Sequence, residues 1–310
     1  MGSHQHVMWI VFGFLVLSLL LLDLQVFHRK IHIVRIREAL LWSCGWIALA
    51  LIFNAFVWYT LGEQKALEFL TGYLIEESLS VDNLFVFVVI FSYFSIAPIY
   101  HHRVLFWGIM GAVVMRGLFI ASGAMLIQRF HWIMYVFGLF LVITGIRMLF
   151  YQEREIHPEK NPFVRILKRF LPICDQYEGQ RFLIRREGKI CATTMLLVLV
   201  VVETTDILFA VDSIPAIFAI TNDPFIVYTS NIFAILGLRS LYFLLAGIMG
   251  RFVYLKVGLS FVLSFIGVKM LIADLYKIPT LIALGVVAAI LAISIIASLA
   301  KGKVKSPHTP

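Results

Sequence analysis

The sequence predicts an all-α polytopic membrane protein with about nine transmembrane helices. Hydrophobic residues make up 61% of the chain and charged residues 14%, whereas soluble domains are roughly 45–50% apolar and about 25% charged. The mean hydropathy of +0.94 agrees. The apolar residues form blocks of about 20, long enough to cross a ~30 Å hydrocarbon core as a helix. Only helices and closed β-barrels satisfy the hydrogen bonds of the backbone in lipid. The blocks lack the alternation of apolar and polar residues that barrel strands show, so we expect helices.

Nine segments match this pattern in chain order. The first lacks the basic start and small-residue cleavage site of a signal peptide, so we interpret it as a retained span. The predicted spans are 7–27, 39–61, 70–94, 104–127, 131–150, 191–218, 224–249, 252–273 and 280–300.

The basic residues predict the orientation. With the N-terminus outside, ten Lys and Arg fall in the short inside segments and nine in 151–190, so 19 lie inside, against Lys65, Arg129 and Lys277 outside. Lys and Arg gather in cytoplasmic loops, so this split predicts an inner (cytoplasmic) membrane protein with its N-terminus outside and its C-terminus in the cytoplasm. The net charge of +8 therefore does not indicate a nucleic-acid partner.

Three landmarks recur in the same order and predict an internal repeat. An acidic motif is followed by a buried arginine one helix later and by a third motif after one more helix. The offsets are 130, 123 and 122 residues. The pairs are EESLSVDN (76–83) with DILFAVDS (206–213), Arg116 with Arg239, and TGIRMLF (144–150) with IGVKMLI (266–272). Helices three and six run in opposite directions, so the repeat is inverted, a plan typical of secondary transporters.

The repeat divides the chain into five parts. The loop between the repeats contains VRILKRFLPI (164–173), which fits either a basic amphipathic helix on the inner leaflet or a solvated linker. The parts are two N-terminal helices in 1–69, the first repeat in 70–150, a basic cytoplasmic loop in 151–190, the second repeat in 191–273, and a C-terminal helix with a basic tail in 274–310.

Six acids lie in predicted helices three and six. Each buried charge costs about 2.5–3.5 kcal/mol on insertion scales, so six unpaired acids cost on the order of 15–20 kcal/mol. Arg116 and Arg239 are expected to be structural counter-charges, but they are too few, so either acids are protonated or a cation enters. The acids are Glu76, Glu77, Asp82, Glu203, Asp206 and Asp212.

Helical geometry groups these side chains. Residues seven apart differ by about 20° around a helix, so Asp206 shares a face with Ser213, as Glu76 does with Asn83. Asp82 and Asp212 lie beside those faces, rotated by about 100° around their helices. Glu203 lies one turn before Asp206 on the same side.

Pro215 provides a second route to oxygen ligands. It lacks an N–H, so it is expected to kink or interrupt helix six and free carbonyl oxygens there.

The donor types select the class of cation. Carboxylate, amide, hydroxyl and carbonyl oxygens suit hard ions such as Mg²⁺, Ca²⁺ or Mn²⁺. None of the nine His lies in helices three or six, and the three Cys form no CxxC pattern. We therefore expect neither a thiolate metal site nor a disulfide framework.

Two segments carry a family resemblance. YLIEESLSVDNLFVFVVIFSYF (73–94) and VETTDILFAVDSIPAIFAITNDPFIVYTSNIFAILGLRSLYFLL (202–245) resemble the TerC integral membrane proteins, and more closely their Alx-type branch. The resemblance covers about 5–300, and the family looks related to the LysE transporter superfamily. The family is named for tellurite resistance, but its better-supported members are linked to Mn²⁺ export and metal homeostasis. At Glu77 some relatives carry Lys. The resemblance implies an ion site of Glu76, Asp82, Asn83, Asp206, Asp212 and Ser213, with Asn231 as a further amide ligand.

These observations predict a secondary transporter of a divalent cation, exporting Mn²⁺ from the cytoplasm, with proton coupling or Ca²⁺ transport as open alternatives. No prosthetic group is expected, the partners are the cation and the lipid bilayer, and association of copies of the chain stays open. No P-loop is present, so ATP coupling is not expected. We expect no enzyme: paired carboxylates could serve an intramembrane hydrolase, but the sequence contains no recognisable protease motif. A non-transporting scaffold or stress-response partner is the main alternative. Tellurite transport is disfavoured by the six acids.

Overall fold

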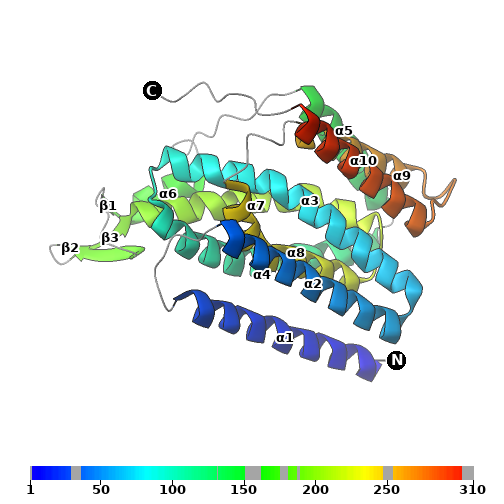
Figure 1. Cartoon of the computed structure of the whole chain (residues 1–310), viewed down its shortest axis with the longest axis horizontal. Coiled ribbons are helices and arrows are strands. Elements are labelled where there is room, and N and C mark those ends of the chain that lie inside the picture. The colour runs from blue at the N-terminus through cyan, green and yellow to red at the C-terminus, as the bar shows by residue number, and fades with distance from the viewer. Residues whose placement is uncertain are drawn as a thin grey trace.

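The computed structural model describes residues 2–28, 36–130, 132–150, 162–174, 181–186, 189–246 and 254–301. Within this part, a long helix occupies each predicted span (Figure 1). These helices are α1 (Gly2–His28), α2 (Ile36–Leu61), α3 (Glu63–Tyr93), α4 (Pro98–Arg129), α5 (Ile133–Phe150), α7 (Thr194–Phe218), α8 (Pro224–Ala246), α9 (Leu255–Leu271) and α10 (Thr280–Ala300).

Six of the described helices are long and apolar enough to cross a membrane: α2, α4, α5, α7, α8 and α10. α1 contributes a shorter apolar stretch, Val7–Leu21. α9 has 17 residues and is shorter than these six helices, and acidic residues interrupt the apolar sequence of α3. The prediction of a helical polytopic membrane protein is therefore confirmed, whereas the count of nine spans stays a prediction. The predicted orientation depends partly on basic residues that lie outside the described residues. These are the ones in 29–35, 151–161, 175–180, 187–188, 247–253 and 302–310.

The helices of the two predicted repeats interleave. α3 packs mainly on α8, α4 packs on α7 and α8, and α5 packs most extensively on α9. α2 covers α3 and α8, and α10 lies beside α9 and α3 (Figure 1). Because α3, α4, α7 and α8 contact one another, a side chain on any of them can meet a side chain from the other repeat.

Glycines bring α5 and α9 into close contact. A Cβ atom on Gly145 would lie 2.7 Å from a carbonyl oxygen of α9, and one on Gly267 would lie 2.7 Å from a carbonyl oxygen of α5. Small residues allow such approach in membrane helices. Gly145 faces Ser260 and Ser264, and Gly267 faces Gly138 and Val142. Adding 122 to 138, 142 and 145 gives 260, 264 and 267, so the two sets of contacts exchange under the predicted repeat.

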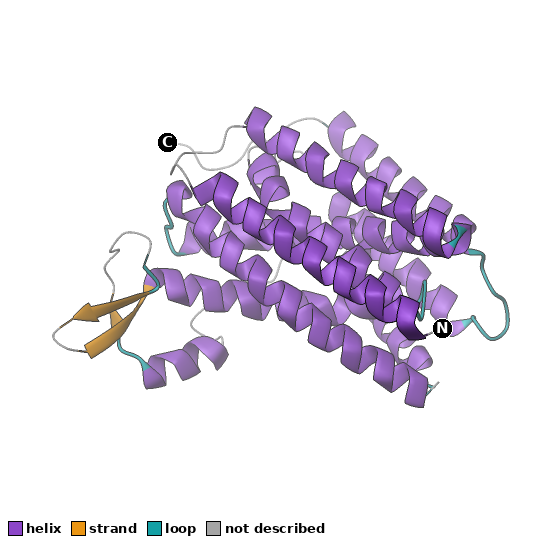
Figure 2. Ribbon diagram, turned by 90° about the horizontal axis from the view of Figure 1, so that it is seen from below, coloured by secondary structure: helices purple, strands orange, loops and turns teal. Residues whose placement is uncertain are grey.

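A small sheet lies beyond the helices and was not predicted (Figure 2). It contains β1 (Ile173–Cys174), β2 (Leu183–Arg186) and β3 (Lys189–Thr193) in the order β1-β3-β2. β1 pairs parallel and β2 antiparallel with β3. The predicted helical start at residue 191 was therefore wrong, and α7 begins at Thr194. Burial alternates along β2, as period-two pleating requires, but Cys191, Ala192 and Thr193 of β3 are all buried, and β3 runs directly into the span and conceals the change.

The basic loop also forms a short helix, α6 (Pro162–Phe170), which is one of the two alternatives that the sequence left open. Val164 is buried where α6 packs against α7, while Phe163 and Ile166 are exposed. α6 and the sheet lie at the same end of the helix bundle (Figures 1 and 2).

The sequence predicted a kink or an interruption at Pro215; the interruption was wrong, and the kink stays a prediction. α7 continues through Pro215 to Phe218, and the backbone N–H of Ala219 donates to the Pro215 carbonyl at 3.1 Å. Proline removes one helical N–H donor, and here it does so in the last turn of the helix. The loss is too close to the helix end to open a break in the middle of the span.

Candidate functional site

A buried polar cluster forms around Arg116 of α4, where α3, α7 and α8 converge. Arg116 is 1% exposed. Its Nη1 donates to Ser213 Oγ at 3.1 Å and to Asn231 Oδ1 at 2.7 Å. Its Nη2 donates to Asp206 Oδ1 at 3.4 Å, and the guanidinium also pairs with Glu76. We call these five residues the Arg116 cluster.

The cluster draws on both predicted repeats. Glu76 and Asp206 occupy equivalent positions, 130 residues apart, on α3 and α7. Asp206 and Ser213 are seven residues apart on α7, and both contact the guanidinium because that spacing puts them on one face. Glu76 and Asn231 are fully buried, and Asp206 and Ser213 are nearly so. The site therefore lies inside the protein and presents oxygen atoms from three helices.

Arg116 does not complete the hydrogen bonding of the cluster. Among the described residues, Glu76 Oε2 and Arg116 Nε are buried without a hydrogen-bond partner. A buried polar atom left without a partner costs free energy, and a carboxylate oxygen costs more than a neutral group. With both carboxylates ionised, the cluster carries two negative charges and one positive charge. The arrangement can thus bind a cation, and its present cation is a side chain.

Only part of the predicted ligand set lies in this cluster. Glu76, Asp206 and Ser213 are brought together. Asp212 instead accepts a hydrogen bond from Thr144 of α5 at 3.5 Å. Asn83 is buried on α3, and the side chain of Asp82 lies outside the described part.

Of the residues predicted to support the site, some lie in the Arg116 cluster and others do not. Asn231 belongs to the cluster and Arg116 is its centre. Arg239 is buried on α8. Glu203 lies so close to α4 that a Cβ on Gly111 would be 2.0 Å from its Oε1. Glu77 points toward α8, with Oε1 3.9 Å from the Cβ position of Gly237.

In the part of the chain that the structure describes, no three His, Cys, Asp or Glu side chains are grouped as a metal site. The two carboxylates that do converge are paired with Arg116. In this arrangement, binding of a divalent ion by both carboxylates requires the guanidinium to move.

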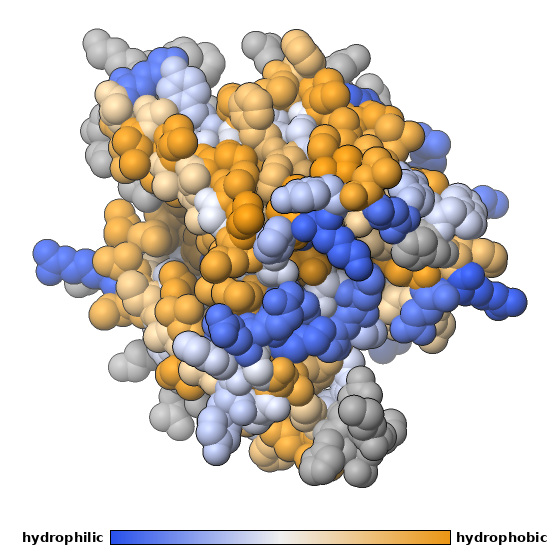
Figure 3. All heavy atoms as spheres, turned by 90° about the vertical axis from the view of Figure 1, so that its right-hand side faces the viewer, coloured by the Kyte–Doolittle hydropathy of each residue, from blue (hydrophilic) through white to orange (hydrophobic). Residues whose placement is uncertain are grey.

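A second polar cluster was missed by the sequence analysis. Glu68, 8% exposed, accepts hydrogen bonds from Lys65 Nζ at 2.9 Å and Thr221 Oγ1 at 2.5 Å. Lys65 also pairs with Asp223 Oδ2 at 3.3 Å. Figure 3 looks at this end of the helices and shows hydrophilic residues gathered between apolar ones. The predicted span began at residue 70, which placed Glu68 in a loop. Its position just over two turns before Glu76, which extends the acidic pattern of this helix, was the available signal.

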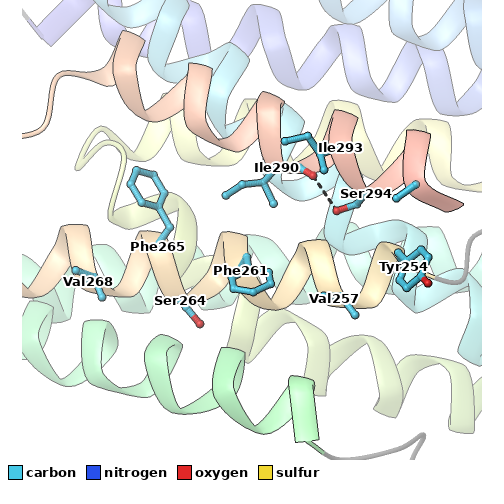
Figure 4. A pocket seen from close by; sticks show the side chains of 10 residues that line it. Tyr254, Val257, Phe261, Ser264, Phe265, Val268, Ile290, Ile293 and Ser294 are labelled. Carbon is cyan, nitrogen blue, oxygen red and sulfur yellow. Dashed lines mark hydrogen bonds between the residues drawn. The ribbon is translucent and has the colours of Figure 1, made fainter.

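The pocket between α9 and α10 has no ionic character. It encloses about 630 Å³ and is lined mainly by apolar side chains, including Val257, Phe261 and Ile290. Its hydroxyl groups include that of Ser294, which already donates to the Ile290 carbonyl at 2.8 Å (Figure 4). A pocket without a charged group is unsuited to an ion, so the Arg116 cluster is the candidate site.

Comparison with known proteins decides the family. The model of the integral membrane protein TerC family matches residues 61–306. The chain belongs to the TerC family. This TerC protein is 52% identical to an uncharacterized membrane protein of Myxococcus xanthus, over 98% of this chain and 94% of that one. It is 47% identical to a protein of Escherichia coli K12 described as a proposed membrane-bound redox modulator, Alx, over 93% of each chain. A Salmonella typhi protein of the same description is 49% identical over 93% and 92% of the two chains.

No solved structure matches this TerC protein. The resemblance to the Alx-type branch, predicted from the two acidic segments, is confirmed by these relatives. Both segments lie within the matched residues, and the Arg116 cluster consists entirely of residues in that range.

Proposed function

We propose that this protein is a secondary transporter of a divalent metal cation and that it exports Mn²⁺ from the cytoplasm. One observation carries the proposal. Glu76 and Asp206, equivalent carboxylates of the two predicted repeats, converge with Ser213 and Asn231 around one cationic group inside the protein. Intramembrane acids mark ion pathways by default, and oxygen donors suit hard divalent ions.

The packing of α5 on α9 supports an inverted repeat. Its contacts exchange under an offset of 122 residues, as expected for two halves related by an axis in the membrane plane. Such halves place their substrate site near the bilayer midplane and rock against each other to expose it on either side. With the N-terminus outside and the C-terminus in the cytoplasm, the end that bears α6 and the sheet faces the cytoplasm.

Transport and a redox role lead to different predictions for the cysteines. Cys44 is exposed and Cys191 is buried. Neither belongs to the Arg116 cluster. We expect a variant with Cys44→Ser, Cys174→Ser and Cys191→Ala to transport Mn²⁺ at the wild-type rate. A variant that folds but loses transport would favour a redox function.

Reconstituted liposomes test the function directly. Purified protein is inserted into vesicles that contain a Mn²⁺-quenched dye, and influx is compared for Mn²⁺, Ca²⁺ and Mg²⁺. We expect Mn²⁺ flux in the wild type and at least about tenfold less in Glu76→Gln and Asp206→Asn, because each removes a charged donor. Glu63→Gln is the matched control, an acid-to-amide change at an exposed position of α3. Absence of flux for all three ions in folded wild-type protein would instead support a scaffold role.

A further inference from the structure

We propose that Arg116 and the transported cation are alternative counter-ions of the same two carboxylates, and that Glu203 receives the guanidinium when the cation binds. This inference rests on the proposed function. Arg116 would then be a built-in competitor that sets the affinity of the site.

The contacts of Arg116 are the first support. Each of its hydrogen-bond acceptors in the cluster is a carboxylate, amide or hydroxyl oxygen, the donor types that a hard divalent cation takes. The oxygens come from α3, α7 and α8, yet they meet at one side chain of α4. The guanidinium therefore occupies the point at which a bound cation would find the same ligands.

The incomplete pairing of the cluster is the second, independent support. Glu76 is fully buried, and within the described structure its Oε2 has no hydrogen-bond partner, nor has Arg116 Nε. A structural ion pair that serves stability alone is expected to satisfy its buried donors and acceptors. The unused carboxylate oxygen is a ligand available to another cation.

Charge excludes joint occupancy. The guanidinium stays protonated at all physiological pH values, so it cannot leave the cluster by becoming neutral. A divalent ion between Glu76 and Asp206 would lie next to a second cation in a buried, weakly screened site. Repulsion between like charges at short range is strong there. The side chain must therefore move away as the ion enters.

Glu203 is the proposed acceptor. It lies one turn before Asp206 on α7, and its carboxylate packs against α4 at Gly111, five residues before Arg116. Long side chains on a helix lean toward its N-terminus, so the Arg116 side chain extends along α4 in the direction of that residue. Moving from Asp206 to Glu203 keeps the guanidinium paired within the same contact between α4 and α7.

The test measures Mn²⁺ binding by purified protein in detergent, from the rise of the melting temperature with MnCl₂ concentration. Removing a competitor should tighten binding, so Arg116→Met is expected to melt lower than wild type without Mn²⁺ but to bind Mn²⁺ about tenfold more tightly or better. Arg239→Met, which removes the corresponding arginine of the second repeat, is the matched control. It is expected to lower the melting temperature equally at every Mn²⁺ concentration.

A double-mutant cycle tests the role of Glu203. Glu203→Gln alone should weaken Mn²⁺ binding, because the displaced guanidinium loses its acceptor. In the Arg116→Met background the same change should have no effect on binding. Weakening by the same factor in both backgrounds would make Glu203 a direct ligand and overturn this part of the inference.

The outcomes separate the two proposals. Wild-type Mn²⁺ transport combined with equal or weaker binding by Arg116→Met would overturn the exchange of counter-ions and leave the transport function intact. No Mn²⁺ dependence in the wild type or in Arg116→Met, with no flux in vesicles, would overturn both. If Arg116→Met does not fold, Arg116→Gln replaces it, since a neutral side chain keeps hydrogen-bond donors but should also release the carboxylates and tighten binding. Unchanged or weaker binding by that variant overturns the inference.

Discussion

The close contact between α5 and α9 gives the most quantitative prediction. In Gly267→Ala, the new Cβ would lie 2.7 Å from the Gly138 carbonyl oxygen and 2.8 Å from the Val142 backbone nitrogen. Both atoms are backbone, so the helices must separate. Overpacking costs about 1–3 kcal/mol, and contact with rigid backbone favours the upper value. Alanine has a higher helix propensity than glycine, which offsets about 1 kcal/mol of this cost. The expected net loss is about 2 kcal/mol of unfolding free energy, equivalent to about 4 °C in melting temperature.

Thermal melting in detergent, followed by circular dichroism, measures this loss. Gly285→Ala is the matched control, because that glycine is exposed on α10 and its Cβ would meet nothing within 4 Å. We expect its melting temperature to be unchanged or slightly raised. Gly145→Ala should resemble Gly267→Ala, because the two positions exchange under the repeat. Equal stability of Gly267→Ala and Gly285→Ala would refute the close packing, and with it this support for the repeat.

Three further predictions concern the polar groups. Gly111→Ala should push the flexible Glu203 carboxylate aside, lowering Mn²⁺ flux several-fold with a stability loss below about 1 kcal/mol, whereas Gly108→Ala should leave flux near wild type. Glu68→Gln should lower the unfolding free energy by about 1–2 kcal/mol in chemical or thermal melts, because it weakens a buried charged hydrogen bond, and Glu63→Gln should not. Finally, if one divalent cation exchanges for two protons, no net charge crosses the membrane, and flux in vesicles should be insensitive to an imposed membrane potential. A flux that follows the potential would contradict that charge balance.

The helices were predictable because their signal is thermodynamic and local. An apolar block of about 20 residues has one stable form in lipid, so each predicted span coincides with a described helix to within several residues. The errors occurred where that constraint ends. The apolar residues Ile190, Cys191 and Ala192 of β3 lead directly into the span, and the pairing of β3 with β1 and β2 distinguishes it from the helix. Pro215 is compatible with a continuous helix because its missing donor falls in the last turn.

The site was predictable only as far as single-helix geometry reaches. Spacing by seven residues predicted that Asp206 and Ser213 share a face, and both contact Arg116. The same geometry placed Asp212 about 100° around α7 from that face, and its side chain accepts a hydrogen bond from Thr144 of α5 instead. Which face of α7 meets α4 depends on how the helices are rotated against each other. The sequence predicted only a counter-charge role for Arg116. The tertiary structure was therefore needed to show that this arginine lies at the centre of the cluster.

The converging carboxylates also limit what the site can exchange. Of the six acids in predicted helices three and six, Glu76 and Asp206 are the ones whose described side chains converge on the guanidinium, and Glu203 lies one turn before Asp206 on α7. Two carboxylates balance one divalent cation, and Arg116 then balances Glu203, so the loaded site is neutral. Without the cation, three carboxylates face one guanidinium and the charge is −2. Because an unbalanced buried charge is costly, neutrality is restored when two protons replace the ion. Under the proposed function, we therefore expect these four groups to exchange one divalent cation for two protons.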